Sequence, residues 1–297
     1  MKSRIAKQIL YAVLAASSVA ACEKMNLSES ADSENSGETS VTLRVRQFEQ
    51  TPFPVTRAAD ITALCTRLSF LVYDSDGTRI RQVEQQTGAE DYGQTSIYLP
   101  KGHYFLVVLA HSGQGNPTST NPRKIAFSNK TGFTDTFLYA DSLIVSDSDI
   151  SRDIALKRIV AMVRFVFDDK LPAKANRIRF YYEGGSGTFD AGADGWGVVK
   201  SKQSQYFDIA GNEQKFEIYT IPRLDSDHLE VMVTTFHATG DDDTGDIVTE
   251  KSIDSIPVRR NHITTCKGYL FAPVYGMTFT ITIDDDWLGD LNFQIPK

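Results

Sequence analysis

The chain has 297 residues, of which 41% are hydrophobic, and its formal net charge at pH 7 is −7. A chain that is acidic overall and has no basic run is poorly suited to bind nucleic acid or anionic lipid headgroups, so we expect neither as a partner. The length is sufficient for two domains of ordinary size.

The N-terminal segment has the order of a secretory signal. Three basic residues come first, an apolar run follows at 9–16, and small side chains at 17–21 lead to Cys22. The apolar run is too short to span a bilayer core of about 30 Å. Because the signal carries three basic residues and no acidic one, its removal moves the formal net charge from −7 to −10.

The four residues Val19-Ala20-Ala21-Cys22 resemble the lipobox of bacterial lipoproteins. This resemblance implies that residues 1–21 are a signal peptide that is removed, and that Cys22 is lipid-modified and becomes the new N-terminus. The lipid would tether the exported protein to a membrane. The alternative is an ordinary signal peptide in which the cysteine is a coincidence.

Residues 22–40 are rich in Ser, Glu, Asp and Asn and have few apolar side chains. Such a segment cannot bury enough apolar surface to offset the entropy of ordering it, so we predict a flexible, acidic stalk. Acidic residues directly after a lipidated cysteine also resemble the surface-export signals of Bacteroidota lipoproteins, although Glu23 is followed here by Lys24. That resemblance implies display on the cell surface.

From Val41 onward, short apolar runs are separated by turn residues. Val41, Leu43 and Val45 alternate with polar residues, which predicts a strand. The turn residues Asp74–Gly77 lie between two such runs and predict a hairpin. Residues 59–64 have room for one helical turn. The strands expected in this half lie at 41–46, 64–73, 79–83, 95–99 and 103–110.

A polar segment at 146–150 marks the boundary to a second half of the same kind. The run 154–167 is apolar apart from Arg158 and Arg164, and it predicts one long strand or two strands with a bend. Strands at this spacing, separated by Gly, Asp and Asn, predict an all-β chain with two antiparallel β-sandwich domains in series, at 41–150 and 151–297. The further strands expected here lie at 177–182, 215–221, 228–238, 249–257, 268–271, 278–283 and 291–295.

Two cysteines remain when Cys22 is assigned to lipid. Exported proteins can form disulfides, but Cys65 and Cys266 are far apart in the sequence and fall in different predicted domains. We therefore favour two free, buried thiols over a disulfide bridge.

No catalytic or cofactor-binding motif is present in the sequence. The five histidines have no metal-ligand spacing and are expected on the surface or on strand faces. A nucleophile elbow and a phosphate-binding glycine loop are both missing. We therefore expect no enzyme activity, no cofactor and no metal site. One alternative stays open, because the oxygen ligands of Asp241–Asp246 could hold Ca²⁺.

Two tryptophans support a rival hypothesis. Trp196 lies between two glycines, and Trp287 lies near the C-terminus. Exposed indole rings on one face would allow stacking on a sugar ring, whereas buried rings would only cover the edges of a sandwich core.

The segment Pro257–Phe271 resembles the FimB-type fimbrial anchor lipoproteins of Bacteroidota. In that family an Arg-Asn pair, an apolar residue and a Thr lead through a Gly to an apolar-Phe end. The lipobox and the segments 56–58, 70–77, 102–105 and 157–161 agree with the family in the expected order. The residues that match the motif are Arg260, Asn261, Thr264, Gly268 and Phe271.

The resemblance implies two transthyretin-like β-sandwich domains and a non-enzymatic role. The chain would be a lipid-anchored outer-membrane anchor or accessory subunit that attaches or caps a fimbria used in adhesion. Its partners would be fimbrial pilin subunits, bound by strand addition at a sheet edge, and the outer membrane, bound through the lipid on Cys22. The alternative is a glycan-binding surface lipoprotein of a polysaccharide-uptake system, and an enzyme is a distant third.

Two further expectations follow from the resemblance. Polymerising pilins of the family lose an N-terminal strand after cleavage at an arginine, whereas an anchor has to keep it; the candidate arginines are Arg44, Arg46 and Arg57. The motif itself is expected to be structural. Gly268 would need a positive φ or the lack of a side chain, and His262 would contribute little to stability.

Overall fold

The computed structural model describes residues 37–49, 61–129, 133–170, 172–209, 214–239, 245–271, 279–284 and 293–294. Cys22, residues 23–36 of the predicted stalk, Arg57, Trp287 and residues 241–244 of the acidic loop lie outside this part of the chain. Residues 38–40, predicted as the end of the stalk, instead form the start of the first strand, Glu38–Glu49. The described residues belong to one compact unit, Gly37–Lys297. Within them, no helix is long and apolar enough to cross a membrane.

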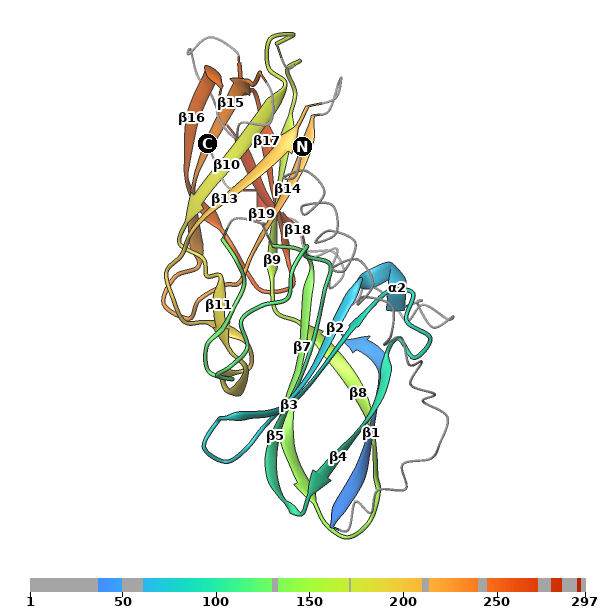
Figure 1. Ribbon diagram of the computed structural model, residues 1–297. Coiled ribbons are helices and arrows are strands. Elements are labelled where there is room, and N and C mark those ends of the chain that lie inside the picture. The colour runs from blue at the N-terminus through green and yellow to red at the C-terminus, as the bar shows by residue number, and fades with distance from the viewer. Residues whose placement is uncertain are drawn as a thin grey trace, which may run out of the picture. The chain divides into compact units, whose positions relative to one another are not determined.

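The first half of the unit forms a seven-stranded sheet with the order β3-β2-β5-β7-β8-β1-β4 (Figure 1). A single helical turn, α2 (Ile61–Leu64), precedes β2. Buried side chains of β1, β4 and β8 share one core with those of β2 and β5, so the sheet folds around this core as the two layers of a sandwich. The strands are β1 (Glu38–Glu49), β2 (Arg67–Tyr73), β3 (Arg79–Gln86), β4 (Gln94–Pro100), β5 (Gly102–His111), β7 (Thr136–Val145) and β8 (Ile150–Arg158).

The second half contains a four-stranded sheet, β13-β10-β15-β16, and a five-stranded sheet, β14-β9-β17-β18-β19. A second core lies between them, and in it the rings of Phe165 and Phe180 stack at 4.6 Å. The strands are β9 (Ala161–Phe167), β10 (Arg177–Glu183), β13 (Lys202–Asp208), β14 (Lys215–Thr220), β15 (His228–His237), β16 (Asp246–Pro257), β17 (Ile263–Gly268), β18 (Thr280–Asp284) and β19 (Phe293–Gln294).

A third core joins the two halves. It contains Leu71 of β2 and Leu109 of β5 together with Phe189 and Ile221 of the second half. Because β2 and β5 bury both of their faces, their sequences are continuously apolar rather than alternating. A small sheet, β12-β11-β6, lies at the same junction. Its elements, with the adjoining helical turn, are β6 (Ile125–Ala126), β11 (Thr188–Asp190), η1 (Ala191–Ala193) and β12 (Trp196–Gly197).

The all-β prediction is confirmed, and the pairings are antiparallel except for β1–β8 and β9–β17, which are parallel. The predicted run 154–167 is two strands, β8 and β9, with a break at Ile159 and Val160. Because β8 pairs with β1, residues 150–158 belong to the first sheet rather than to the second half.

One predicted strand was wrong, and β7 and β13 were missed, as were the short strands β6, β11 and β12. The strand placed at 268–271 lies earlier, at Ile263–Gly268, because the turn at Asn261 starts it. Strand β7 was missed because the polar pair Asp141-Ser142 interrupts its apolar pattern. Strand β13 was missed because an edge strand of polar composition has little alternation to detect.

Candidate functional site

The asparagine of the family motif lies at the junction of the two halves. Asn261 adopts a left-handed conformation with φ of 59°, and its N–H donates to the carbonyl of Val160 at 2.8 Å. Its side-chain Oδ1 accepts a hydrogen bond from Arg158 Nη1, also at 2.8 Å. Asparagine tolerates this backbone conformation better than most residues. The motif residue therefore fixes the entry into β17 and binds the end of β8.

Arg158 is the centre of this contact. Only 3% of the residue is exposed, and its guanidinium donates to both carboxylate oxygens of Asp135, at 2.6 and 2.7 Å. It also lies over the ring of Phe137, 4.7 Å from the centroid. A buried guanidinium has to be paired with a carboxylate and hydrogen-bonded, because an unpaired charge in the interior lowers the stability of the fold. Sequence reasoning noted Arg158 as an interruption, but its partners are distant in the chain and leave no local signal.

The arginine of the motif covers one of the two tryptophans. The Arg260 guanidinium lies 4.0 Å from the ring centroid of Trp196, and its Nη1 donates to Asp194 Oδ2 at 2.8 Å. Burial lowers the pKa of Arg260, and the nearby Asp194 carboxylate opposes this shift. Trp196 also borders a small cavity of about 260 Å³ with the exposed Leu224. One face of the indole is therefore covered by Arg260, and the second ring, Trp287, lies outside the described residues.

The remaining motif residues hold the ends of β17. Thr264 is buried and its hydroxyl donates to the Pro257 carbonyl at 2.6 Å. Gly268 ends the strand in extended pairing with Phe167, so the expectation of a positive φ is wrong. Phe271 packs partly buried against the second core, and its N–H donates to Asp169 Oδ2. These contacts are consistent with a structural motif.

Two histidines are buried, and one of them, His111, lies on strand β5, in agreement with the expected strand-face positions. His111 is fully buried, and burial, followed by the charge of Arg67, lowers its pKa to about 4. His262 is 8% exposed and its Nδ1 lies 2.7 Å from the Arg260 carbonyl, so this imidazole packs within the motif turn and not at the surface.

Both internal cysteines are free and buried, as predicted. Burial raises the pKa of Cys65 to about 11 and that of Cys266 to about 12, so neither thiol is a nucleophile at neutral pH. In the described part of the chain, no group of three or more His, Cys, Asp or Glu residues could hold a metal ion. The calcium hypothesis falls on residues that this part does not cover.

The first strand of the unit is an internal strand. Strand β1 pairs with β4 on one side and with β8 on the other. Two of the candidate cleavage arginines lie on it: Arg44 donates to Gln94 Oε1 at 3.2 Å, and Arg46 forms an exposed ion pair with Asp153 at 3.5 Å. The segment that leaves the stalk is thus hydrogen-bonded along both edges.

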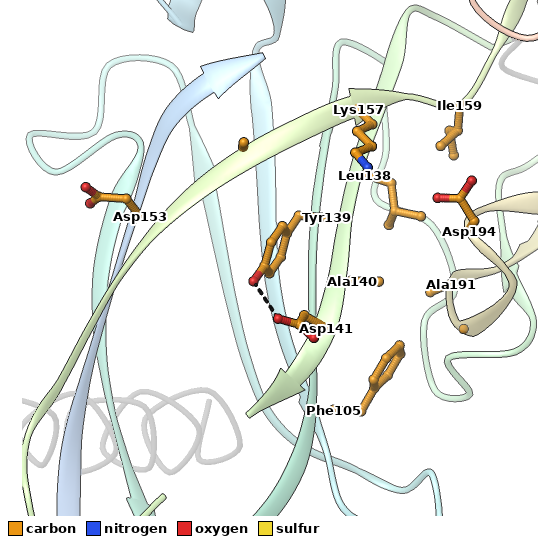
Figure 2. Close-up of a pocket in the computed structure, with 12 residues that line it drawn as sticks. Phe105, Leu138, Tyr139, Ala140, Asp141, Asp153, Lys157, Ile159, Ala191 and Asp194 are labelled. Atoms are coloured by element: carbon orange, nitrogen blue, oxygen red, sulfur yellow. Dashed lines mark hydrogen bonds between the residues drawn. The ribbon is translucent and has the colours of Figure 1, made fainter. Parts of the chain in front are cut away.

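A cavity of about 420 Å³ lies beside β7 and β8 (Figure 2). Its lining includes Phe105, Ala140 and Ala155, and the helical turn η1 contributes Ala191 and Gly192. Figure 2 shows the Tyr139 hydroxyl donating to the Asp141 carboxylate at its border, at 3.2 Å. Sequence reasoning missed this site, because it depends on how two consecutive strands separate.

The described residues form an all-β unit with an integrated first strand and several open sheet edges. The chain matches the model of the fimbrillin-A associated anchor proteins Mfa1 and Mfa2 over residues 32–292. It therefore belongs to this family, which confirms the resemblance seen in the sequence.

Solved structures with low sequence identity and a TM-score of at least 0.50 share the fold. A proposed polysaccharide-binding protein from Bacteroides thetaiotaomicron has 12% identity and a TM-score of 0.51, with 88% of this chain and 99% of that chain covered. A proposed adhesin from Bacteroides ovatus has 15% identity and a TM-score of 0.50, with 76% and 86% covered. The fimbrial anchor protein Mfa2 from Porphyromonas gingivalis has 13% identity and a TM-score of 0.42, with 84% and 98% covered. No curated protein matches the chain.

Proposed function

We propose that this protein is a lipid-anchored subunit of the outer membrane that attaches or caps a fimbria used in adhesion. Family membership supports a fimbria-associated role. The lipobox-like segment that ends at Cys22, followed by an acidic stalk, supports a tether at the N-terminus. The fimbrial partner would be a pilin subunit that adds a strand to a sheet edge, because an unpaired edge offers main-chain donors and acceptors.

The observation that carries this proposal is the internal position of β1. A lipid anchor can resist a pulling force on the fimbria only if the strand that follows the stalk is firmly part of the fold. Strand β1 is hydrogen-bonded to β4 and to β8, so pulling it out would break both ladders. We further propose that the unit is organised as two β-sandwich domains, because each half has a core of its own and the third core joins them.

The anchor is tested by Cys22→Ser. We expect the variant to leave the membrane fraction and to be found soluble, since it has lost its lipid attachment site. Stable anchoring needs more than one acyl chain, so the wild-type protein should be multiply acylated. The matched control is Cys65→Ser, which removes a buried thiol and should leave fractionation unchanged. A Cys22→Ser variant that still sediments with membranes would contradict the anchor.

The fimbrial role is tested separately by deleting the gene. We expect fimbriae that are shed or of altered length while pilin synthesis continues. Normal fimbriae in the deletion strain, together with measurable binding of oligosaccharides by the purified protein, would favour the glycan-binding alternative instead.

A further inference from the structure

The turn that carries the family motif borders the cavity of about 260 Å³ beside Trp196. The lining of this cavity comes from the second half of the unit. It is supplied by the loop that contains β12, the turn at 222–227, the end of β16 and the end of β18. Apolar side chains make up much of the lining, among them Pro222, Leu224, Pro257 and Ile283.

One edge of the Arg260 guanidinium, which also lines the cavity, has no hydrogen-bond partner. Its Nη1 donates to Asp194 Oδ2 at 2.8 Å, whereas its Nε and Nη2 are buried and unpaired. Nε and Nη2 direct their hydrogens to the same side of the planar group and form a two-donor fork. Among the unpaired buried side-chain atoms of the described residues, Arg260 is the only residue that contributes two. Because unpaired buried donors lower stability, an acceptor that reaches this fork from outside the chain would bind favourably.

Neighbouring groups hold the fork in place. The guanidinium lies over the ring of Trp196, and only 15% of the Arg260 side chain is exposed. The side chain of Asp194 is 71% exposed, so water screens this ion pair and the charge of Arg260 is incompletely balanced. A planar donor pair that is already fixed loses little entropy when an anion binds to it.

The other two arginines of the lining differ in their pairing. Arg223 forms an ion pair with Asp225, so it adds no net charge to the cavity. Arg259 is exposed, and within the described residues it has no carboxylate partner. An anion at the cavity would therefore meet the fork of Arg260 and the unpaired charge of Arg259.

A ligand for this cavity needs three properties. A planar carboxylate matches the two donors of the Arg260 fork in geometry and in charge. Hydroxyl groups can donate to the carboxylate of Asp227, which is mostly exposed and whose Oδ1 contacts the His228 imidazole. A compact body with an apolar face suits the apolar lining, because the volume is below the roughly 300–1,000 Å³ of pockets for larger ligands. A sugar ring that carries a carboxylate combines all three.

We propose that this cavity binds the uronic acid residue of an acidic glycan, with its carboxylate on Nε and Nη2 of Arg260. Arg259 attracts the anion, and Asp227 accepts a hydrogen bond from a ring hydroxyl. Trp196 positions the guanidinium and does not stack on the sugar. This inference goes beyond the proposed fimbrial function, because it assigns a ligand to the subunit, and it is tested without fimbriae.

The test compares two sugars that differ at one carbon. Methyl glucuronide carries a carboxylate at C6, whereas methyl glucoside carries a hydroxymethyl group there. Ligand-observed NMR titration measures their binding to the detergent-extracted full-length protein. Methyl glucuronide should bind at least about tenfold more tightly, since two charge-assisted hydrogen bonds depend on its carboxylate. Equal affinities, or no binding of methyl glucuronide, would overturn the proposal.

A conservative variant tests the fork itself. Arg260→Lys keeps a positive charge over Trp196 but lacks the paired donors, so it should weaken binding of methyl glucuronide about tenfold. The matched control is Arg179→Lys, which changes an arginine that lies over the Phe236 ring and outside the cavity. This control should leave binding unchanged. Wild-type affinity in Arg260→Lys would contradict the assignment of the fork.

The exposed arginine is tested in the same titration. Arg259→Ala should weaken binding about threefold at low salt and less at high salt, because an exposed charge is screened. Arg123→Ala removes another exposed arginine, which does not line the cavity, and should leave the affinity unchanged. Equal losses in the two variants would show that only the overall charge of the protein matters, and would exclude Arg259 from the site.

A further measurement leaves the arginines intact. Leu224→Cys places a thiol at the exposed border of the cavity, whereas Cys65 and Cys266 are fully buried. The variant should bind methyl glucuronide normally, and coupling of a bulky maleimide to the folded protein should abolish binding. Undiminished binding by the adduct would place the sugar elsewhere and overturn the proposal.

Other anions separate the sugar from alternative ligands. Arg260-dependent binding of N-acetylaspartate or inorganic phosphate, without binding of methyl glucuronide, would assign the fork to a peptide or a phosphate group and overturn the sugar assignment. The fimbrial role would stand in that case, because deletion of the gene tests it separately. Binding of methyl glucuronide by a protein whose deletion causes shed fimbriae would support both proposals.

Discussion

At the residue scale, Asn261 combines a left-handed backbone with a buried hydrogen bond from Arg158. Asn261→Ala should lower the free energy of unfolding by about 3 kcal/mol, because it loses the bond to a charged group and places Cβ in an unfavourable conformation. Asn261→Gly should cost only about 2 kcal/mol, because glycine keeps the backbone conformation at no strain. Urea unfolding measures both. Equal losses would show that the conformation contributes nothing.

A second prediction at this scale concerns pH. The Nδ1 of His111 accepts from the Gly113 N–H at 3.1 Å, so protonation would put a proton against a donor inside a buried site. Because the pKa is about 4 in the folded protein and 6.5 ordinarily, the unfolded chain binds a proton that the folded chain does not. Stability should therefore fall as the pH is lowered from 6.5 to 4, and the loss should be complete below 4.

The measurement is the unfolding free energy against pH, for the wild-type protein and for His111→Gln. Carboxylates also titrate near pH 4 in both proteins. The contribution of His111 is therefore the difference between the wild-type curve and the His111→Gln curve. The wild-type curve should be steeper between pH 6.5 and 4 by up to about 3 kcal/mol in total. Parallel curves would mean that the pKa of His111 is the same in the folded and in the unfolded chain.

At the scale of elements, the loop between β11 and β12 packs against the first half of the unit. A Cβ on Gly195 would lie 2.7 Å from Ile159 and 2.8 Å from Leu138, and its φ is +74°. Gly195→Ala should cost about 3 kcal/mol through both strain and overpacking. Gly88→Ala is the control, because Gly88 has a φ of +97° and no atom within 4 Å of an added Cβ, so only strain of about 1 kcal/mol applies.

The strands show which parts of the fold the sequence could predict. Strands with one buried face, such as β4, alternate and were placed within a residue or so at each end. Strands buried on both faces, such as β5, were equally clear as apolar runs. Strand β13 has neither pattern, because its one buried residue, Gln203, is polar. The pattern of apolar residues along a strand reflects which of its faces are buried. A strand without a regular buried face therefore cannot be recognised from its sequence.

The site was less predictable than the strands. The motif from Arg260 to Phe271 was found through a family resemblance, but the partners Arg158 and Asp135 are 103 and 126 residues away from Asn261 and give no local signal. The gap between β7 and β8 depends on a pairing that stops after two residue pairs, and nothing in either strand's composition marks that point.

At the scale of the whole molecule, an anchor has to remain one chain from its lipid to its fold. Arg44 lies where β1 is paired with both β4 and β8, and Arg46 lies at a bulge between residues that are paired with β8. A protease needs an unpaired, extended segment. We therefore predict that an arginine-specific protease will not cut the folded protein after Arg44 or Arg46, and that protein isolated from cells begins at Cys22. Mass spectrometry of the intact protein and N-terminal sequencing check this. Protein from cells that begins after Arg44 or Arg46 would identify a polymerising subunit, because removal of that segment would expose the edges of β4 and β8 to a neighbour's strand.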